Sequence, residues 1–232
     1  EAFPYARFRV EGTDLLPRRG SAIIVANHRS YFDTAAVAVT VARSGRPLRF
    51  LGKAEVFDAP VVGQLARAMG GIRVERGTGS DEPLRAAARA LDSGEMVAMM
   101  PQGTIPRGKA FFEPELQGRW GAARLAAMSG APIIPIGLWG TERVWPRSAK
   151  IPNVFQLVDP PLVTTRVGQA VEGLTGDVDA DTKAIMSAIV ELLPAEARTH
   201  REPTIEELAA TYPSGKVPDD LDAELHRRPG TD

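Results

Sequence analysis

A short apolar run that ends abruptly in a polar cluster constrains this fold more than any other feature. Residues 22–26 read Ala-Ile-Ile-Val-Ala and follow a Gly-Ser turn, which is typical of a buried β-strand. Residues 27–33 read Asn-His-Arg-Ser-Tyr-Phe-Asp, and a mostly apolar stretch long enough for a buried helix runs from 34 to 43. We therefore predict a strand, a polar loop at its carboxyl end, and a helix that begins near Asp33, where free backbone N–H groups and the helix dipole favour a carboxylate.

The spacing of His28 and Asp33 determines what this loop can do. On one continuous helix the two side chains would point about 140° apart and would not meet. If His28 lies in the loop and Asp33 begins the helix, the imidazole can fold back onto the carboxylate, which would fix its tautomer and leave one ring nitrogen open to a proton. We interpret the pair as a general base with an orienting acid, acting on a substrate hydroxyl.

Two other interpretations of the loop stay open. Ser30 could act as a nucleophile, although it lies only two residues from His28 on a tight loop and would approach at an awkward angle. His28 could also be a surface histidine and Asp33 no more than a helix cap, and the spacing taken alone favours this plain structural role.

Apolar strands and helices alternate along the chain from residue 21 to about 140. This alternation predicts a three-layer α/β domain, a largely parallel sheet flanked by helices. The run 131–140 is apolar but contains prolines, so we expect it at a sheet edge or a bulge. The domain is expected to span 1–195 and a polar, loosely packed C-terminal extension to span 196–232. Further strands are expected at 48–53, 72–76, 95–100 and 153–162, and helices at 61–69, 81–92, 119–129 and 182–193.

The stretch Asn27–Asp33 resembles the first signature, Asn-His-x-Ser-x-x-Asp, of the glycerolipid acyltransferases, the 1-acyl-sn-glycerol-3-phosphate (lysophosphatidic acid) acyltransferase family. Three more motifs follow in the order of that family. The second leads from a connector to an arginine that closes a strand, and the fourth is an apolar Pro-Ile-x-Pro-Ile run, found here at 132–136. The residues that match the second motif are Lys53, Glu55, Phe57 and Arg76.

The third motif departs from the family pattern. Residues 101–105 read Pro-Gln-Gly-Thr-Ile, where the family usually has Pro-Glu-Gly-Thr-Arg. Gln102 can still accept a hydrogen bond through its amide oxygen, and Arg107 could take over a phosphate contact if the loop bends. The departure points to a different acceptor or to a weakened enzyme.

The resemblance implies an O-acyltransferase. His28 would deprotonate a hydroxyl of a lysophospholipid acceptor, and that oxygen would attack the thioester of acyl-CoA or acyl carrier protein, with no cofactor. The alternatives are a catalytically silent lipid- or acyl-binding module, and an acyltransferase for glycerol phosphate or a glycolipid. The resemblance places substrate contacts at Lys53, Arg76, Gln102, Gly103, Thr104 and Arg107, with Arg76 on a phosphate, and the acyl site at Pro132, Ile134 and Pro135.

Composition excludes several other classes of protein. A formal net charge of -1 leaves no basic excess for nucleic acid as a partner. The absence of cysteine rules out a disulfide framework, a thiolate zinc site and a cysteine nucleophile. The three histidines lack the spacing of a zinc motif, so we expect no metal.

No apolar run is long enough to span a bilayer, so the amphiphilic substrates imply a peripheral protein at the cytoplasmic face of a membrane. The sequence begins at Glu1 rather than Met, which leaves open an N-terminal anchor that has been removed. The aromatic residues considered for an exposed apolar rim are Phe111, Phe112, Trp139 and Trp145.

Overall fold

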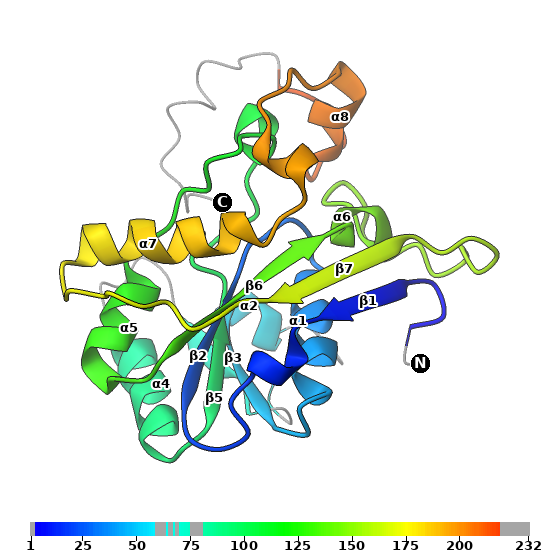
Figure 1. Ribbon diagram of the computed structural model, residues 1–232. Helices are drawn as coiled ribbons and strands as arrows, with labels where there is room; N and C mark the ends of the chain where they lie inside the picture. Colours follow the sequence, from blue (N-terminus) through cyan, green and yellow to red (C-terminus); the bar gives the residue numbers. More distant parts are fainter. Residues whose placement is uncertain (1–2, 59–63, 65–66, 68–69, 75–80, 219–232) are drawn as a thin grey trace.

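The computed structural model describes residues 3–58, 64, 67, 70–74 and 81–218, and it contains a seven-stranded sheet with the order β1-β7-β6-β2-β5-β3-β4 (Figure 1). Every neighbouring pair is parallel except β6 and β7, which run antiparallel. The strands are β1 (Arg7–Glu11), β2 (Ala22–Ala26), β3 (Leu48–Lys53), β4 (Ile72–Val74), β5 (Met96–Met99), β6 (Ile133–Trp139) and β7 (Leu162–Val167).

Helices cover both faces of the sheet and make the three layers that the alternation predicts. The α-helices are α1 (Asp33–Ala42), α2 (Ala54–Asp58), α4 (Glu82–Asp92), α5 (Gly121–Ser129), α6 (Thr141–Val144), α7 (Val178–Glu191) and α8 (Ile205–Ala210). Three 3-10 helices, η1 (Thr13–Leu15), η2 (Gly108–Phe111) and η3 (Ala195–Arg198), lie between them. The expected fold class is confirmed, whereas the helix expected at 61–69 falls largely outside the described residues.

Strand β2 lies at the centre of the core because it is apolar on both faces. Ile24 and Ala26 pack with α1 on one face, while Ile23 and Val25 pack with α4, α5 and α7 on the other. All five residues of β2 are buried, which explains the continuous apolar run. Burying one isoleucine side chain contributes about 1.5–3 kcal/mol to folding, so both faces fix the position of the loop that follows β2.

The expected edge position of the proline-containing run at 131–140 is wrong. Strand β6 lies inside the sheet, between β7 and β2. Pro135 is tolerated there because the pairing of β6 with β7 covers only Ile136–Trp139. The N–H and C=O of one strand residue point to the same neighbour, and the carbonyl of Pro135 accepts a bond from the backbone N–H of Gly168, just beyond β7 (2.9 Å). A backbone N–H at position 135 would point toward β7 beyond the end of its pairing with β6, so the proline removes no hydrogen bond between these two strands.

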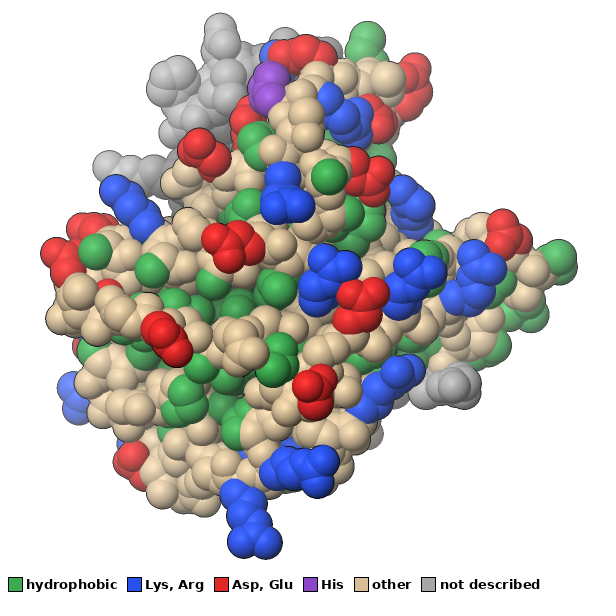
Figure 2. All heavy atoms as spheres, viewed as in Figure 1, with side chains coloured by type: hydrophobic (Ala, Val, Ile, Leu, Met, Phe, Trp, Pro, Cys, Tyr) green, Lys and Arg blue, Asp and Glu red, His purple; other side chains and the backbone are tan. Residues whose placement is uncertain are grey.

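The strand expected at 153–162 is also misplaced, since β7 begins only at Leu162. The preceding segment is a loop that projects from the body of the molecule between α6 and β7 (Figure 1). Its apolar side chains face solvent, and Figure 2 shows hydrophobic atoms at the tip of this projection. The exposed large hydrophobic residues of the loop are Ile151, Phe155, Leu157 and Val158.

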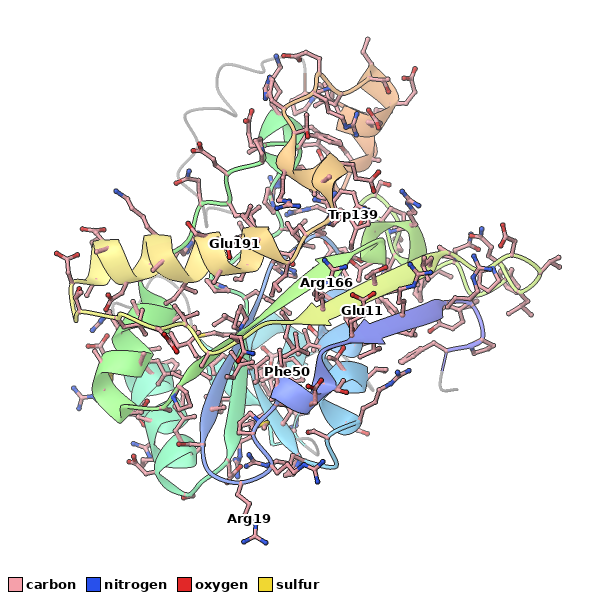
Figure 3. The ribbon with its side chains drawn as sticks, in the orientation of Figure 1. Glu11, Arg19, Phe50, Trp139, Arg166 and Glu191 are labelled. Carbon is pink, nitrogen blue, oxygen red and sulfur yellow. The ribbon has the colours of Figure 1, made fainter. Side chains whose placement is uncertain are left out.

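Strand β7 joins β1 to the rest of the sheet. The two strands pair in parallel, and the guanidinium Nε of Arg166 on β7 lies 2.8 Å from a carboxylate oxygen of Glu11 on β1 (Figure 3). Residues 7–11 and 162–167 thereby extend the sheet beyond β6.

The C-terminal extension is packed over part of its length. Thr204 and Glu207 form a capping box at the start of α8. The two residues that follow the end of α8, Thr211 and Tyr212, are buried. Gly108 has a left-handed φ of 55°, and a Cβ there would lie only 2.6 Å from the Tyr212 hydroxyl. The extension therefore seats α8 closely on the loop that follows β5. The boundary at residue 195 stays a prediction, and residues 219–232 are outside the described part.

Candidate active site

Three loops meet at one edge of the sheet and form the candidate site. They follow β6, β2 and β5, which are adjacent parallel strands, so their carboxyl ends lie together, at the edge where α/β proteins bind ligands. The loops comprise residues 27–32, 100–112 and 140–147. Each loop contacts at least one of the other two through a hydrogen bond or a ring contact.

The imidazole of His28 rests against the carboxylate of Asp33. Their Nδ1 and Oδ2 atoms are 2.8 Å apart, and the Asp33 side chain is completely buried. Oδ2 also accepts the backbone N–H groups of Arg29 (2.6 Å) and Ser30 (2.8 Å). Because a carboxylate only accepts, Nδ1 carries the proton and donates it. This leaves Nε2 as the basic nitrogen on a side chain that is 21% exposed, with no hydrogen bond to any described residue.

The other polar residues of this loop fasten it to its neighbours. The Asn27 amide donates to the backbone carbonyl of Leu138 (2.9 Å) and accepts from its N–H (2.7 Å). The Ser30 hydroxyl accepts the N–H of Phe32 and donates to the carbonyl of Trp145 at 2.6 Å. Ser30 is fully buried. Its hydroxyl therefore anchors the loop, which does not favour the role of nucleophile.

Gln102 supports the histidine from the loop that follows β5. Its amide oxygen accepts the backbone N–H of His28 at 2.6 Å, and the residue is buried. Gly103 follows with a left-handed φ of 72°, and Thr104 is half-buried. The amide oxygen that was expected to contact substrate is therefore hydrogen-bonded to the backbone of the loop that carries His28.

An arginine from the third loop contacts the backbone of the third motif. Ile105 is buried, and its carbonyl accepts a hydrogen bond from the guanidinium Nη1 of Arg147. Arg147 is itself only 7% exposed. A guanidinium therefore stands beside position 105 although the residue there is isoleucine.

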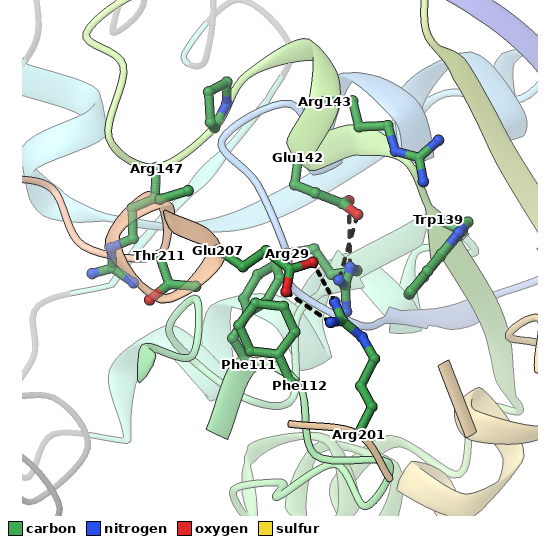
Figure 4. Close-up of a pocket in the computed structure, with 12 residues that line it drawn as sticks. Arg29, Phe111, Phe112, Trp139, Glu142, Arg143, Arg147, Arg201, Glu207 and Thr211 are labelled. Atoms are coloured by element: carbon green, nitrogen blue, oxygen red, sulfur yellow. Dashed lines mark hydrogen bonds and ion pairs between the residues drawn. The ribbon is translucent and has the colours of Figure 1, made fainter. Parts of the chain in front are cut away.

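A cavity of about 230 Å³ opens beside Arg29, the residue after the histidine (Figure 4). The Arg29 guanidinium lies over the rings of Phe111 (4.2 Å) and Trp139 (4.3 Å) and pairs with Glu142 at 3.3 Å. Three of the four aromatic residues considered for an exposed rim, Phe111, Phe112 and Trp139, therefore line this cavity. The fourth, Trp145, is half-buried beside Tyr31, with 5.6 Å between the ring centroids. The remaining lining residues are Arg143, Pro146, Arg147, Arg201, Glu207, Ala210 and Thr211.

Among the described residues that line this cavity, the predicted substrate contacts Gln102, Gly103, Thr104 and Arg107 are absent. Lys53 ends β3 and its side chain is not described, while Arg76 lies outside the described residues. Arg107 is half-buried just before η2. In the predicted acyl site, Ile134 is buried in the core on the α1 face, Pro135 is buried within β6, and Pro132 is exposed before that strand. The acyl-site assignment stays a prediction.

The cavity residues outside the motifs were not predicted from the sequence. Arg29 occupies the variable position of the first motif, and Glu142, Arg143 and Arg147 follow β6 with no recognisable pattern. Arg201 and Glu207 belong to the extension. Only the strand order and the docking of α8 bring these segments together.

The described residues contain no group of three histidine, aspartate or glutamate side chains arranged to hold a metal ion. In the same part of the chain, every helix is too short or too polar to cross a bilayer.

Comparison with known proteins finds a family model and several relatives that match this chain. A family model described as Acyltransferase matches residues 7–139, more than half of the chain. An uncharacterized protein of Mycobacterium tuberculosis is 33% identical over 163 residues, which are 67% of this chain and 43% of that protein. A protein of Arabidopsis thaliana named 1-acyl-sn-glycerol-3-phosphate acyltransferase, chloroplastic, is 27% identical over 151 residues, 64% of this chain and 40% of its own length. The chain thus spans less than half the length of these relatives.

A solved structure has the same fold. The crystal structure of the 1-acyl-sn-glycerophosphate (LPA) acyltransferase PlsC from Thermotoga maritima aligns with a TM-score of 0.59 and 21% identity, covering 81% of this chain and 73% of that one. At this identity the likeness establishes the architecture.

Proposed function

Because the chain belongs to the acyltransferase family, we propose that it is an O-acyltransferase that moves a fatty acyl chain from acyl-CoA or acyl carrier protein to a hydroxyl of a lysophospholipid such as lysophosphatidic acid. The observation that carries this proposal is the His28–Asp33 pair, with Nδ1 held at 2.8 Å from a buried carboxylate and Nε2 left open. The chemistry needs a base at neutral pH, and an oriented neutral imidazole supplies one.

In the proposed reaction His28 acts first as a base and then as an acid. Nε2 takes the proton of the acceptor hydroxyl as its oxygen bonds to the thioester carbonyl carbon. The buried carboxylate of Asp33 stabilises the imidazolium that forms. The tetrahedral intermediate then collapses, the carbon–sulfur bond breaks, and the leaving thiolate receives the proton from Nε2. The products are an ester and a free thiol.

The developing oxyanion would be stabilised by donors near Thr104, because the backbone N–H of Gly103 already donates to the carbonyl of Met100 at 2.9 Å. Two features support this placement. The Gln102 side chain, shortly before Thr104, is hydrogen-bonded to the backbone of His28, so the loop lies next to the base. Gly103 adopts a left-handed φ, which turns the backbone sharply at that point.

The acceptor and the product are amphiphiles, so we place the protein peripherally on a membrane surface. The projecting loop 150–158 is the best-supported contact, because Phe155 is 86% exposed and Val158 is fully exposed. Lys150, which is also exposed, precedes the apolar residues. This loop replaces the aromatic residues 111, 112 and 139 as the proposed apolar rim.

Release of free CoA from acyl-CoA in the presence of lysophosphatidic acid tests the proposal. His28→Ala should lower the transfer rate by roughly 10²–10⁴-fold, the usual contribution of a general base. His200→Ala is a matched control, because His200 is 63% exposed and lies in the extension. An unchanged rate in His28→Ala would contradict the assignment.

A second candidate is a catalytically silent lipid- or acyl-binding module. It is favoured by the exchange of two residues in the third motif, where Gln102 and Ile105 stand in place of a glutamate and an arginine. Binding of acyl-CoA without release of CoA, with every acceptor tried, would support it over the enzyme.

A further inference from the structure

Arg29 follows the candidate base directly and contributes to its surroundings through its backbone. The backbone N–H of Arg29 donates to Oδ2 of Asp33 at 2.6 Å, and the same oxygen lies 2.8 Å from Nδ1 of His28. The backbone N–H of Ser30 is a third donor to this oxygen, at 2.8 Å. The other carboxylate oxygen, Oδ1, is buried and accepts no hydrogen bond from any residue that the structure describes. The orientation of the carboxylate therefore depends on the three donors that meet at Oδ2.

The side chain of Arg29 is held against two aromatic rings and one carboxylate (Figure 4). Its guanidinium carbon lies 4.2 Å from the centroid of the Phe111 ring and 4.3 Å from that of Trp139. Such cation–π contacts are strongest where water is excluded, and only 12% of this side chain is exposed. Nε lies 3.3 Å from Oε2 of Glu142, and Nη2 donates to Oε1 at 3.4 Å. Groups on η2, β6 and α6 therefore fix the guanidinium in one place. We refer to Phe111, Trp139 and Glu142 as the Arg29 clamp.

The clamp also keeps the positive charge of Arg29 on Glu142 and away from Asp33. A buried carboxylate attracts any cation that can reach it. If the guanidinium turned toward Asp33, it would compete with the imidazole of His28 for that carboxylate. Leaving the clamp would strand the half-buried carboxylate of Glu142 without its partner, which is unfavourable. The carboxylate of Asp33 is therefore left to the imidazole.

We propose that Arg29 is a positioning residue for the acyl transfer. The clamp holds the Cα of Arg29 in place, so its backbone N–H stays on Oδ2 of Asp33. Asp33 in turn holds the proton on Nδ1 of His28 and keeps Nε2 free to act as the base. Arg29 needs no contact with substrate for this role. The catalytic consequence rests on the proposed function, whereas the effect on the imidazole does not.

Nitrogen NMR of the complete chain tests the effect on the imidazole without turnover. At a pH of about 8 an ordinary imidazole is neutral, and the chemical shifts of its two nitrogens show which one carries the proton. Wild-type His28 should show a single tautomer, with the proton on Nδ1. Arg29→Met, which keeps an unbranched side chain against the rings, should show a mixture of tautomers. The signal that disappears in His28→Ala identifies the residue.

Three further variants separate the clamp from the stability of the fold. Glu142→Gln keeps the shape of the partner but removes its charge, so it should change the tautomer in the same direction as Arg29→Met. Arg29→Lys keeps the charge but loses the planar fork, and it should lie between Arg29→Met and wild type. Arg166→Met is the matched control, because Arg166 pairs with Glu11 at 2.8 Å between two strands. It should leave the His28 signal unchanged.

Release of CoA measures the catalytic consequence. Because Arg29 is expected to act on the base and not on the substrate, Arg29→Met should lower kcat about tenfold, the scale of one hydrogen bond to a charged group. KM for acyl-CoA and for lysophosphatidic acid should stay within about twofold of wild type. A raised KM with an unchanged kcat would indicate a substrate contact and overturn the proposal.

The NMR results can overturn the proposal independently of turnover. A mixture of tautomers in the wild type would do so, as would a single tautomer in both Arg29→Met and Glu142→Gln. An altered tautomer in Arg166→Met would show a general effect of lost ion pairs instead of positioning by Arg29. A chain whose His28 tautomer depends on Arg29 but which transfers no acyl group would refute the proposed function and leave the action of Arg29 on the imidazole standing.

Discussion

At the residue scale, the hydrogen bond between Gln102 and His28 gives position 102 a structural role. The amide oxygen accepts the His28 N–H in a buried site, and a glutamate could accept the same bond. Gln102→Glu should therefore keep the fold and most of the transfer activity. Gln102→Leu has nearly the same size but leaves a buried N–H unpaired, which should cost about 1–3 kcal/mol and lower kcat. Urea unfolding and CoA release compare the two variants, and a leucine variant as stable and active as wild type would contradict this role.

The histidine pair could be predicted from sequence because both residues lie on one short loop. Asp33 follows His28 by five positions, and the short connection from the end of β2 to the start of α1 allows the loop to bring the two side chains together. The role of Gln102 could not be predicted in this way. Its partner is a backbone N–H 74 residues away. Every residue type except proline has a backbone N–H, so this contact leaves no recognisable pattern in the sequence.

At the element scale, a buried hydrogen bond contributes to the seating of α8. Thr211 accepts the N–H of Gly108 and donates to the carbonyl of Leu208 (2.7 Å). Thr211→Val preserves the shape but removes the acceptor, which should cost about 1–3 kcal/mol of local stability. Faster hydrogen exchange at the Gly108 amide would report it. Thr199→Val is the control, since that exposed hydroxyl bonds only to Ala195 in its own turn, and equal exchange in both variants would contradict the prediction.

Asp181, in the first turn of α7, should make the stability of the fold depend on pH in the acidic range. The hydrogen bond from the backbone N–H of Thr175, with others from Gly176 and the Thr175 hydroxyl, holds the pKa of Asp181 below its ordinary value of 3.8. A lowered folded-state pKa stabilises the fold above the unfolded-state value, and this stabilisation is lost as pH falls through the folded-state value.

Asp181→Asn should therefore be less stable than wild type at pH 7, and the difference should shrink once the pH falls below about 4. Urea unfolding at a series of pH values measures this convergence. Asp92→Asn, which changes an exposed carboxylate at the end of α4, should show no such trend. A stability difference for Asp181→Asn that stays constant down to pH 2 would rule out the linkage.

A strand or helix could be predicted from the sequence where its burial produces a clear local pattern of apolar residues. The run that forms β2 is apolar on both faces, and α7 carries an apolar stripe at Ile185 and Ile189, so both were found from periodicity. The prolines in and just before β6 favour a sheet edge or a bulge because they lack N–H donors. The actual tolerance comes from the short pairing of β7, which begins beside Ile136. That pairing is a long-range property, absent from the local pattern.

At the scale of the whole molecule, the order of the strands creates the site. The order β6-β2-β5 places the loops after residues 139, 26 and 99 side by side, although the first and last motifs are about a hundred residues apart in sequence. The alternation of strands and helices predicts a parallel sheet, but it does not give the strand order or the return of the extension to η2. The histidine was therefore predictable, whereas the arginine-lined cavity beside it was not.

The projecting loop determines how the whole molecule would meet a bilayer. Phe155 and Val158 are the most exposed large apolar residues of this loop. Burial of each apolar side chain in the acyl region contributes about 1.5–3 kcal/mol, and Lys150 adds about 1 kcal/mol on an anionic surface. Phe155→Ser with Val158→Ser should therefore weaken binding to phosphatidylglycerol vesicles by about 100-fold or more. Ile205→Ser, an equally apolar residue that is 73% exposed on α8, should leave binding unchanged because it lies outside the loop. Sedimentation with vesicles measures both variants. Equal sedimentation of the double variant and wild type would show that the loop does not hold the protein on the membrane.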